Sequence, residues 1–364
     1  MKIDLVAGTR PNVMKIAPLY QTLKTLAWCE PRLVFLKQHE HRHMSHDLLD
    51  EFGITDFEVL KLSATSFGDR LGEIVSSYSD LLTHSRPDAT LVPGDVDVAV
   101  GAALAAKRAQ LPVIHLEAGL RSHDRGMPEE INRIIIDSVS DLLLTPSEEA
   151  TQNLIFHEGH APTTVQFVGN IMIDSLVQVV SGTRKGEVMG RFDVAPGGYA
   201  VCTFHRPSNV DSPETLGAIV DILIQLAADR TIVFPVHPRT RRVLDDNGLT
   251  ARLEAAGLRL CEPMGYTDFV NLVSNAAFVL TDSGGIQEET SYMDVPCFTL
   301  RGSTERPITL TLGTNHLVDI DTVLPILTRR MAEADRGAVH IPLWDGQTAW
   351  RAAHAIRSWW QGRA

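Results

Sequence analysis

The sequence predicts an α/β protein made of two Rossmann-like domains, each built on a parallel sheet. At 364 residues the chain exceeds what a single core usually holds. Short apolar runs alternate with amphipathic segments through the first half, and the alternation begins again near residue 199. Strands that alternate with helices imply parallel sheets covered on both faces.

Ten apolar runs are the predicted strands. A helix-like stretch at 13–26 follows the first run, and an Ala-rich helix ending at Ala109 follows the third. In the first half the runs lie at residues 3–7, 32–36, 89–93, 111–116 and 142–145. In the second half they lie at residues 199–203, 231–235, 258–261, 277–280 and 295–300.

The boundary between the domains is expected near residues 168–170, before an amphipathic stretch at 173–180. The polar, Gly-containing segment 181–198 has few apolar anchors and fits a connection. The predicted domains are therefore residues 1–169 and 170–346. The amphipathic C-terminal segment, about 347–364, is expected to cross back onto the first domain.

The composition is that of a soluble globular protein, with 44% hydrophobic and 21% charged residues. The net charge of -12 argues against a general nucleic-acid binder, which normally carries a basic surface. The chain enters a strand directly, without a signal peptide, and no apolar run could cross a bilayer. Its four cysteines are widely spaced and form no metal-ligand pattern. A reduced, cytoplasmic setting is expected.

The segment 277–289 has the layout of an anion site. Its apolar run ends in Thr-Asp-Ser-Gly-Gly and passes directly into a predicted helix. Adjacent glycines let a phosphate approach the backbone, Ser283 adds a hydroxyl donor, and the helix N-terminus presents unpaired N–H groups. Glu288 or Glu289 could accept hydrogen bonds from the two hydroxyls of a ribose. The competing interpretation is a glycine-stabilised turn without a ligand.

Polar and charged residues also follow five other predicted strands. Ligands collect at the carboxyl ends of the strands in open parallel sheets, so these residues are candidates for a site. They are Arg10, Asp95, His115 and Glu117 in the first half, and His205, Arg206 and His237 in the second.

Two of these candidates have a plain structural alternative. Arg10 and Lys15 lie at the start of a predicted helix, where two cations suit a phosphate or carboxylate but could simply face solvent. Asp95 follows a glycine in a strand-end turn, where an aspartate commonly caps the next helix. Asp97 could serve as the cap instead and leave Asp95 free.

Carboxylates in the first half suggest proton transfer. Glu117 ends an apolar strand and would be costly to bury unpaired, so it either pairs with Arg121 or is poised to move a proton. Glu129 and Arg133 lie four residues apart on a predicted helix that begins with proline. Glu129, rather than Glu130, is therefore expected to share a pocket with Arg133. The alternative is that these acids only complement the helix dipole.

Histidines offer two further signals. His205 beside Arg206 is a candidate if both face the carboxylates, although a lone histidine there is often structural. Four histidines at residues 39, 41, 43 and 46 look like a metal site. They lack fixed carboxylate or thiolate partners, which favours a polar loop over zinc. No metal is expected.

Taken together, these motifs resemble the non-hydrolysing UDP-N-acetylglucosamine 2-epimerases. The match runs from Met1 to about Val318, with the motifs in the expected order. They are Gly8-Thr-Arg-Pro11 with Lys15, Gly94-Asp95, His115-Leu-Glu-Ala-Gly-Leu-Arg121, Pro128-Glu-Glu-Ile-Asn-Arg133, Val168-Gly-Asn170, His205-Arg206, Asp282-Ser-Gly-Gly-Ile-Gln-Glu-Glu289 and Thr304-Glu-Arg-Pro307.

The resemblance implies a GT-B architecture, in which two Rossmann-like domains face an interdomain cleft that holds the nucleotide sugar. It implies inversion at C2 of UDP-N-acetylglucosamine, by loss of the C2 proton and UDP to give 2-acetamidoglucal and then re-addition of both. No cofactor is implied, and a homodimer is expected. Related substrates altered at C3 or C6, including diacetamido-uronate nucleotides, remain open.

The resemblance also assigns roles. Ser283, Gly284 and Gly285 would hold the phosphates, Glu289 the ribose and Phe269 the uracil, with His237 and Arg306 as further binding residues. Arg10, Lys15, His205 and Arg206 would stabilise the departing pyrophosphate, because leaving-group charge is the main electrostatic demand of an elimination. The proton-transfer candidates are Asp95, Glu117 and Glu129, with Arg133 beside them. Which of the three takes the proton stays open.

Three other functions compete with this one. A hydrolysing relative would release free N-acetylmannosamine and UDP through the same carboxylates. A GT-B glycosyltransferase would need an acceptor and would not require three carboxylates. A non-catalytic nucleotide-sugar binder would require none of them.

Overall fold

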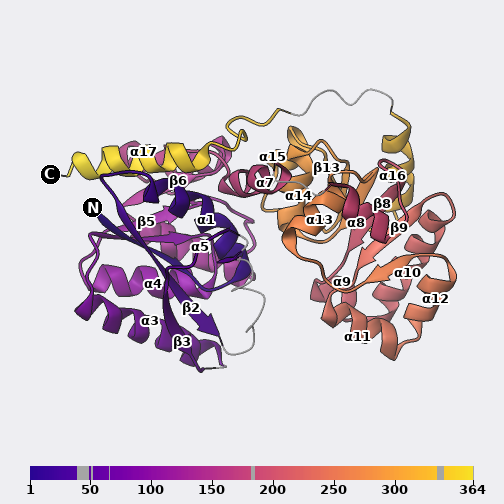
Figure 1. The fold of residues 1–364 in the computed structure, drawn as a ribbon, viewed down its shortest axis with the longest axis horizontal. Coiled ribbons are helices and arrows are strands. Elements are labelled where there is room, and N and C mark those ends of the chain that lie inside the picture. Colours follow the sequence, from indigo (N-terminus) through magenta and orange to yellow (C-terminus); the bar gives the residue numbers. More distant parts are fainter. Residues whose placement is uncertain (39–48, 51, 65, 182–184, 334–339, 364) are drawn as a thin grey trace. The chain divides into compact units, whose positions relative to one another are not determined.

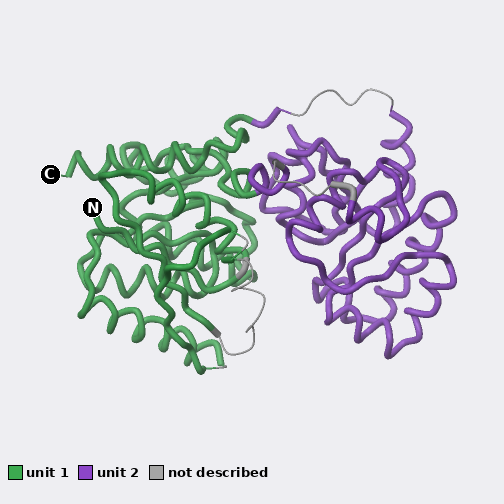
Figure 2. Tube along the Cα trace, in the orientation of Figure 1, with its two compact units in different colours: residues 1–175, 342–364 green, residues 176–341 purple. Residues whose placement is uncertain are grey.

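The computed structural model divides the chain into two compact units (Figure 2). Unit 1 comprises residues 1–175 and 342–364, and unit 2 comprises residues 176–341. The residues that the structure describes are 1–38, 49–50, 52–64, 66–181, 185–333 and 340–363.

Unit 1 is built on a seven-stranded parallel sheet (Figure 1) with the order β3-β2-β1-β4-β5-β6-β7. Its central strands consist almost entirely of buried residues, as expected for a sheet covered on both faces. The strands are β1 (Lys2–Ala7), β2 (Glu30–Gln38), β3 (Glu58–Leu62), β4 (Ala89–Pro93), β5 (Val113–Leu116), β6 (Leu142–Thr145) and β7 (Val165–Phe167).

Unit 2 repeats the plan with a six-stranded parallel sheet in the order β10-β9-β8-β11-β12-β13. Its strands are β8 (Tyr199–Thr203), β9 (Thr231–Pro235), β10 (Arg259–Cys261), β11 (Phe278–Thr281), β12 (Cys297–Leu300) and β13 (Asn315–Val318).

Three strands were not predicted: β3, β7 and β13. All three lie at sheet edges, where one side has no neighbouring strand, and each contains half-buried or exposed residues. An edge strand needs fewer apolar residues, so it leaves a weaker apolar run in the sequence.

The helices of unit 1 pack in two groups. α4 packs against α3 and α5, while α1 packs against α17 (Figure 1). Nearly every residue of α4 from Val98 to Ala106 is buried, as expected for a helix covered on several sides. The helices are α1 (Arg10–Lys24), α3 (Phe67–His84), α4 (Asp97–Arg108), α5 (Pro128–Val139), α6 (Glu148–Gln152), a π-helical turn (Asn153–His157), a 3-10 turn (Pro162–Thr164), α7 (Ile171–Ser181), which continues into unit 2, and α17 (Thr348–Gln361).

α17 brings the C-terminal segment back to the first sheet. Its buried residues Ala349, Ala352, Ala353 and Ile356 follow helical spacing and form one apolar stripe. Asp174 accepts hydrogen bonds from the N–H groups of Thr348 and Ala349 at 3.1 and 2.7 Å, which secures the start of this helix.

The remaining helices surround the second sheet. The main core of unit 2 combines residues of β8, β9, β11 and β12 with apolar faces of α10 and α12. These helices are α8 (Lys185–Arg191), α9 (Pro207–Val210), α10 (Pro213–Ala227), α11 (Pro238–Asp246), α12 (Leu249–Ala255), α13 (Tyr266–Val273), α14 (Gly284–Tyr292), α15 (Ile308–Thr311) and α16 (Val323–Ala332). Among the described residues, no helix is both long and apolar enough to span a membrane.

Each sheet has one point where the strand order reverses. In unit 1 it lies between β1 and β4, and in unit 2 between β8 and β11. Crossover helices leave such neighbouring strands in opposite directions and open a crevice beyond their carboxyl ends. The motifs Gly8-Thr-Arg10 and Gly94-Asp95 follow the first pair, while His205-Arg206 and Asp282-Ser283 follow the second.

Candidate active site

Asn12 joins the two strand ends at the switch point of unit 1. Its side-chain oxygen accepts a hydrogen bond from Gly8 N at 3.3 Å, and its Nδ2 donates to the carbonyl of Pro93 at 3.2 Å. Asn12 is buried and was not a predicted site residue. It holds the turn after β1 next to the turn after β4.

Lys15 and Glu117 form a buried ion pair in the same crevice. Lys15 belongs to α1, while Glu117 follows β5. Gly94 lies against the pair, since a side-chain Cβ added there would be 2.5 Å from Lys15 Nζ and 3.1 Å from Glu117 Oε2. Of the two alternatives for Glu117, pairing with Arg121 is excluded. Arg121 bonds instead to Asp137 of α5 and to Glu158, directly after the π-helical turn.

Glu117 has an unusual backbone and an unusual side-chain environment. Its φ of 74° lies in the left-handed region, which costs an ordinary residue roughly 1–2 kcal/mol. Its Oε1 is buried and, among the described residues, has no hydrogen-bond partner. Strain and an unsatisfied polar atom at one residue are typical of a functional site rather than of a stabilising contact.

Asp95 does not cap the next helix. The N-cap of α4 is Val96, without any side-chain cap, and Asp97 pairs with Arg70 at 2.7 Å. The carboxylate of Asp95 instead accepts from Arg133 Nη2 at 2.5 Å. This geometry removes the structural alternative weighed for Asp95.

The expectation that Glu129, rather than Glu130, shares a pocket with Arg133 stays a prediction. On this helix the ion pair of Arg133 is with Glu130, three residues before it, at 3.3 Å. Glu130 is buried, and its carboxylate also accepts hydrogen bonds from the N–H groups of Ser122 and His123, at 2.8 and 3.1 Å, which compensate for its burial. Glu129 is exposed on the first turn of α5 and therefore remains accessible to a ligand.

Glu129 nevertheless lies beside Asp95. Both line a hollow of about 380 Å³ in unit 1, together with Thr9, Phe67, Arg70, Asp97 and Asn132. Asn132 donates to the carbonyl of Asp95 at 2.8 Å and so holds the turn that carries this carboxylate. Asp95 and Glu129 are thus brought to one hollow, while Lys15 and Glu117 meet at Gly94, directly before Asp95.

A buried charge network supports this crevice from behind. Asp137 lies 2.6 Å from His115 Nδ1 and accepts from Arg121 at 2.6 Å. His115 Nε2 lies 2.8 Å from the carbonyl of Gly94, so the network reaches the turn before Asp95. Burial alone would raise the pKa of Asp137, but the charges of His115 and Arg121 outweigh it and hold that pKa below its usual range.

Asp282 organises the switch point of unit 2. Its fully buried carboxylate accepts from the backbone N–H groups of His205 and Arg206 at 3.0 and 2.9 Å, and from Asn209 at 3.1 Å. Burial would raise the pKa of Asp282, but His205, Arg206 and Asn209 outweigh it and hold the pKa below its usual range. Sequence reasoning placed Asp282 at a strand end without a role.

Asp282 also orients the ring of His205. Its Oδ1 lies 3.0 Å from Nδ1 of that half-exposed histidine. An ionised carboxylate only accepts hydrogen bonds, so Nδ1 carries the proton and Nε2 is the ring atom left for a ligand. Arg206 is held in place through its Nε, which donates to the carbonyl of Asp282 at 3.0 Å.

His237 has a local structural role. It is the N-cap of α11, where its Nδ1 accepts from Arg239 N at 3.2 Å. Burial first, and then the charges of His205 and Arg239, lower the pKa of His237. The neutral ring that results suits an N-cap acceptor, and it lies 5.8 Å from the ring of His205.

The predicted anion segment forms the turn from β11 into α14. Ser283 is the N-cap, yet its side chain makes no cap hydrogen bond in the described part of the chain. The N–H group of Ser283 donates to Thr281 Oγ1 at 3.0 Å, and the first helical residues are Gly284 and Gly285, whose N–H groups lie at the helix end that favours an anion. Arg306 lies close, with Nη1 2.9 Å from the position of an added Gly284 Cβ.

Arg306 is held by two carboxylates. It pairs with Glu288 at 3.0 Å and with Glu305 at 3.4 Å. Burial alone would raise the pKa of Glu305, but Arg301 and Arg306 hold it at about 2. Glu289, the next residue along α14, instead accepts from the hydroxyl of Tyr266 at 3.0 Å. Phe269 lies one turn after Tyr266 on α13 and is half-buried.

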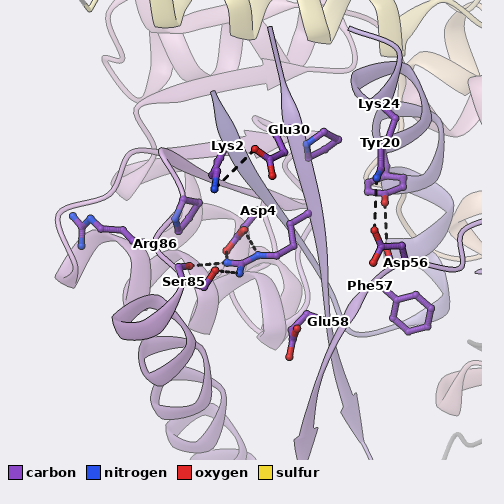
Figure 3. Close-up of a pocket in the computed structure, with 13 residues that line it drawn as sticks. Lys2, Asp4, Tyr20, Lys24, Glu30, Asp56, Phe57, Glu58, Ser85 and Arg86 are labelled. Carbon is purple, nitrogen blue, oxygen red and sulfur yellow. Dashed lines mark hydrogen bonds and ion pairs between the residues drawn. The ribbon is translucent and has the colours of Figure 1, made fainter. Parts of the chain in front are cut away.

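A second hollow, of about 280 Å³, lies at the opposite, amino ends of β1, β2 and β3 (Figure 3). Its centre is Arg32, which donates to both oxygens of Asp4 at 2.7 and 2.8 Å and to the carbonyl of Ser85 at 2.8 Å. Burial raises the pKa of Asp4 despite this contact. Arg32, Asp4 and Ser85 satisfy one another's hydrogen-bonding groups, so we interpret them as a structural ion pair rather than as a ligand site.

Two predictions fall outside the described residues. These are the four histidines at 39, 41, 43 and 46, and the side chain of Arg10, the first residue of α1. Within the described ranges, no group of three or more His, Cys, Asp or Glu residues is arranged to hold a metal ion.

The sequence matches a family model for UDP-N-acetylglucosamine 2-epimerase over residues 21–357. The chain belongs to the UDP-N-acetylglucosamine 2-epimerase family. Within this family, it is 35% identical to the UDP-N-acetylglucosamine 2-epimerase of Methanocaldococcus jannaschii over 327 residues, which are 87% of this chain and 88% of that protein. It is 33% identical to the UDP-2,3-diacetamido-2,3-dideoxy-D-glucuronate 2-epimerase of Pseudomonas aeruginosa over 323 residues, with 87% and 88% covered.

Solved structures of family members agree. The M. jannaschii epimerase in complex with UDP-GlcNAc and UDP superposes with a TM-score of 0.88 at 33% identity, covering 98% of this chain and all of that one. The Neisseria meningitidis epimerase bound to UDP-GlcNAc gives 0.89 at 28% identity, with 98% and 100% covered. A Rickettsia africae glycosyltransferase, at 13% identity and a TM-score of 0.57, shares the fold alone. The UDP-N-acetylglucosamine 2-epimerase family and the predicted α/β fold class are confirmed.

Proposed function

We propose that this protein is a non-hydrolysing epimerase that inverts C2 of UDP-N-acetylglucosamine. The observation that carries the proposal is Glu117, a buried carboxylate in a left-handed conformation at the switch point of unit 1. One of its oxygens is held by Lys15, and the other has no donor among the described residues. Such a carboxylate is suited to take or deliver a proton.

The reaction requires two proton transfers on opposite faces of the sugar. A carboxylate removes the C2 proton, the C1–O bond breaks, and UDP leaves with the electron pair as a C1–C2 double bond forms. A proton then returns to C2 from the other face while UDP adds back to C1. Glu117, Asp95 and Glu129 are the proposed proton-transfer residues, since the structure gathers all three around the turn after β4.

Unit 2 is the proposed binding site of the UDP group. The N-terminus of α14, with Ser283, Gly284 and Gly285, suits the diphosphate. His205 and Arg206 are fixed by Asp282 and would stabilise the charge that grows on the leaving group. Proposed contacts to uracil by Phe269 and to ribose by Glu289 rest on the family resemblance.

The charge of the hollow in unit 1 favours a neutral sugar. Its lining includes the carboxylates Asp95, Asp97 and Glu129. Asp97 pairs with Arg70 and Asp95 with Arg133, so Glu129 gives the lining an excess of one negative charge. A uronate carboxylate would face this negative surface, whereas the hydroxyls of N-acetylglucosamine would not. We therefore propose UDP-N-acetylglucosamine rather than the diacetamido-uronate used by the P. aeruginosa relative.

Solvent isotope labelling tests the proposal. The chain is incubated with UDP-N-acetylglucosamine in heavy water, and the recovered nucleotide sugars are analysed by mass spectrometry and NMR. The proposal expects UDP-N-acetylmannosamine and deuterium at C2 of both epimers. Free N-acetylmannosamine with stoichiometric UDP would identify a hydrolysing enzyme instead. Unlabelled C2 with this substrate and with the diacetamido-uronate would end the epimerase proposal.

Assembly and location extend the proposal. A homodimer is expected from the family resemblance, and light scattering at micromolar concentration measures it directly. All four cysteines are free, which suits the reducing cytoplasm.

A further inference from the structure

Gln287 is the centre of a network of side-chain amides and hydroxyls in unit 2. It lies in the first turn of α14, and its side chain is fully buried. Its Nε2 donates to the carbonyl of Ser283 at 3.2 Å. Its Oε1 accepts from Thr304 Oγ1 at 2.7 Å and from Asn315 Nδ2 at 2.9 Å. One side chain therefore joins the turn before α14, the loop after β12 and the first residue of β13.

The partners of Gln287 fix the direction of each hydrogen bond in the network. The carbonyl of Ser283 can only accept, so the amide nitrogen of Gln287 faces it and the amide oxygen faces the other two residues. That oxygen can only accept, so Asn315 presents its Nδ2 to it and its own Oδ1 to Thr299, whose hydroxyl donates at 2.6 Å. The orientation of both amides is thus determined by the backbone carbonyl at one end.

Two threonines of this network hold the backbone of Arg306. Thr304 Oγ1 accepts from Arg306 N at 3.1 Å, and Thr309 Oγ1 donates to the carbonyl of Arg306 at 2.8 Å. Thr304 is also the hydroxyl that donates to Gln287. Thr309 in turn accepts from Asn315 Nδ2 at 3.2 Å. Each backbone polar group of Arg306 is therefore linked, through one hydroxyl, to an amide that contacts α14 or belongs to it.

This arrangement sets the position of Arg306 relative to the anion turn. A Cβ added at Gly284 would lie 2.9 Å from Arg306 Nη1, so the guanidinium lies against the first residue of α14. The carbonyl that Gln287 holds belongs to Ser283, directly before that glycine. The partial positive charge of the helix N-terminus and the full charge of the guanidinium are therefore brought to one place.

We propose that Gln287 is a positioning residue that holds Arg306 at the diphosphate site through the hydroxyls of Thr304 and Thr309. This inference rests on the proposed binding of UDP to unit 2. The ion pairs described above restrain the side chain of Arg306, whereas the network restrains its backbone. Backbone placement matters because a hydrogen bond to the ligand weakens steeply as its distance and angle depart from the optimum.

The test compares two ligands on matched variants of the full chain. UDP and uridine differ by the diphosphate, so the ratio of their affinities isolates the diphosphate contribution. Calorimetry gives the affinity for UDP, and competition against UDP gives that for uridine. Gln287→Met removes the central amide, and Thr304→Val removes only the hydroxyl that links it to Arg306. The control is Thr290→Val, which removes a buried hydroxyl of α14 that donates to the carbonyl of Ile286 at 2.6 Å.

We expect the wild type to prefer UDP over uridine by at least about 100-fold, since hydrogen bonds to charged groups are the stronger ones. Thr304→Val should reduce this preference about 5-fold or more, the size of one ordinary hydrogen bond, while the affinity for uridine changes little. Gln287→Met should act in the same direction, and Thr290→Val should leave the preference unchanged. In an Arg306→Ala background, Thr304→Val should have little further effect, because the hydroxyl acts through that arginine.

Each other outcome has a distinct meaning. A preference that Thr304→Val or folded Gln287→Met leaves unchanged overturns the positioning role while UDP binding stands. An equal loss of affinity for both ligands overturns it too, since the variant would then disturb the whole site. The same holds if Thr304→Val acts fully in the Arg306→Ala background. Equal wild-type affinity for UDP and uridine overturns both the diphosphate site at α14 and this inference. A wild-type chain that binds neither ligand contradicts the proposed function itself.

Discussion

Gly119 is the glycine of unit 1 at which substitution by alanine should lower the free energy of unfolding most. The residue follows Glu117 by two positions, and its φ of 81° lies in the left-handed region. A Cβ added there would lie 2.3 Å from the carbonyl oxygen of Ala150 and 2.9 Å from its carbon. Both are backbone atoms of the neighbouring helix α6, so no side chain can swing aside.

The cost of Gly119→Ala has two parts. Alanine in the left-handed region costs about 1–2 kcal/mol. Forcing a methyl against backbone costs typically about 1–3 kcal/mol more, as in other overpacked sites. Relaxation is restricted because Gly119 N donates to Asp137 at 3.2 Å and its carbonyl accepts from Asn153 at 2.9 Å. The total loss should therefore be roughly 2–5 kcal/mol.

Gly159→Ala is the matched control. Gly159 lies in the same unit with a φ of 76°, and nothing lies within 4 Å of an added Cβ. It should lose only the conformational part, about 1–2 kcal/mol. The difference between the variants then measures the contact with Ala150.

Tryptophan fluorescence during urea unfolding reports this loss selectively. All five tryptophans, at residues 28, 344, 350, 359 and 360, belong to unit 1. The shift in midpoint multiplied by the slope gives the change in free energy of unfolding. Equal losses for Gly119→Ala and Gly159→Ala would refute the argument, because they would show that the Ala150 carbonyl moves away without cost.

Three further predictions concern carboxylates. Glu117→Gln should lower kcat and deuterium uptake at C2 by about 10²- to 10⁴-fold with UDP affinity retained, and near-normal exchange would remove it from the proton-transfer set. Glu129→Gln should lower turnover without changing the urea midpoint. Glu130→Gln should instead destabilise unit 1 by about 1–3 kcal/mol, because Glu130 is a buried acceptor. The reverse pattern would show that the roles of the two glutamates are exchanged. Glu305, with a folded pKa of about 2 against an ordinary value of 4.5, stabilises the fold above pH 4.5 and loses that contribution as pH falls toward 2. Glu305→Gln should therefore lower the free energy of unfolding at pH 7 by up to roughly 3 kcal/mol. It should also flatten the change in this free energy between pH 4.5 and pH 2. Urea unfolding followed by circular dichroism at pH 7 and near pH 2 measures both effects, and a pH dependence equal to that of the wild type would contradict the prediction.

The sequence predicted the central strands and their polar ends because both signals are local. An apolar run such as that of β11, followed by a turn rich in small polar residues, needs no knowledge of distant contacts. The partner of Glu117 could not be predicted in this way. Lys15 lies 102 residues away and reaches it only because β1, β4 and β5 are neighbours in the sheet.

The choice between Glu129 and Glu130 shows a different limit of local patterns. Spacings of three and four both place a glutamate beside Arg133 on a helix. The decision comes from the N–H groups of Ser122 and His123, in a loop without periodicity, which bury Glu130 and leave Glu129 exposed.

Asp282 shows what strand register adds to a motif. Parallel pairing aligns Thr281 of β11 with Thr203 of β8, and their hydroxyls lie 2.7 Å apart. The next residue on β11 is therefore placed at the turn that carries His205 and Arg206, where its carboxylate collects their backbone N–H groups. A strand-end aspartate is read as a ligand contact when the motif is taken alone. The strand register instead places Asp282 where it orients His205 and Arg206. Asp282→Asn should therefore weaken UDP binding indirectly, through the altered positions of those two residues, although Asp282 itself does not contact the nucleotide.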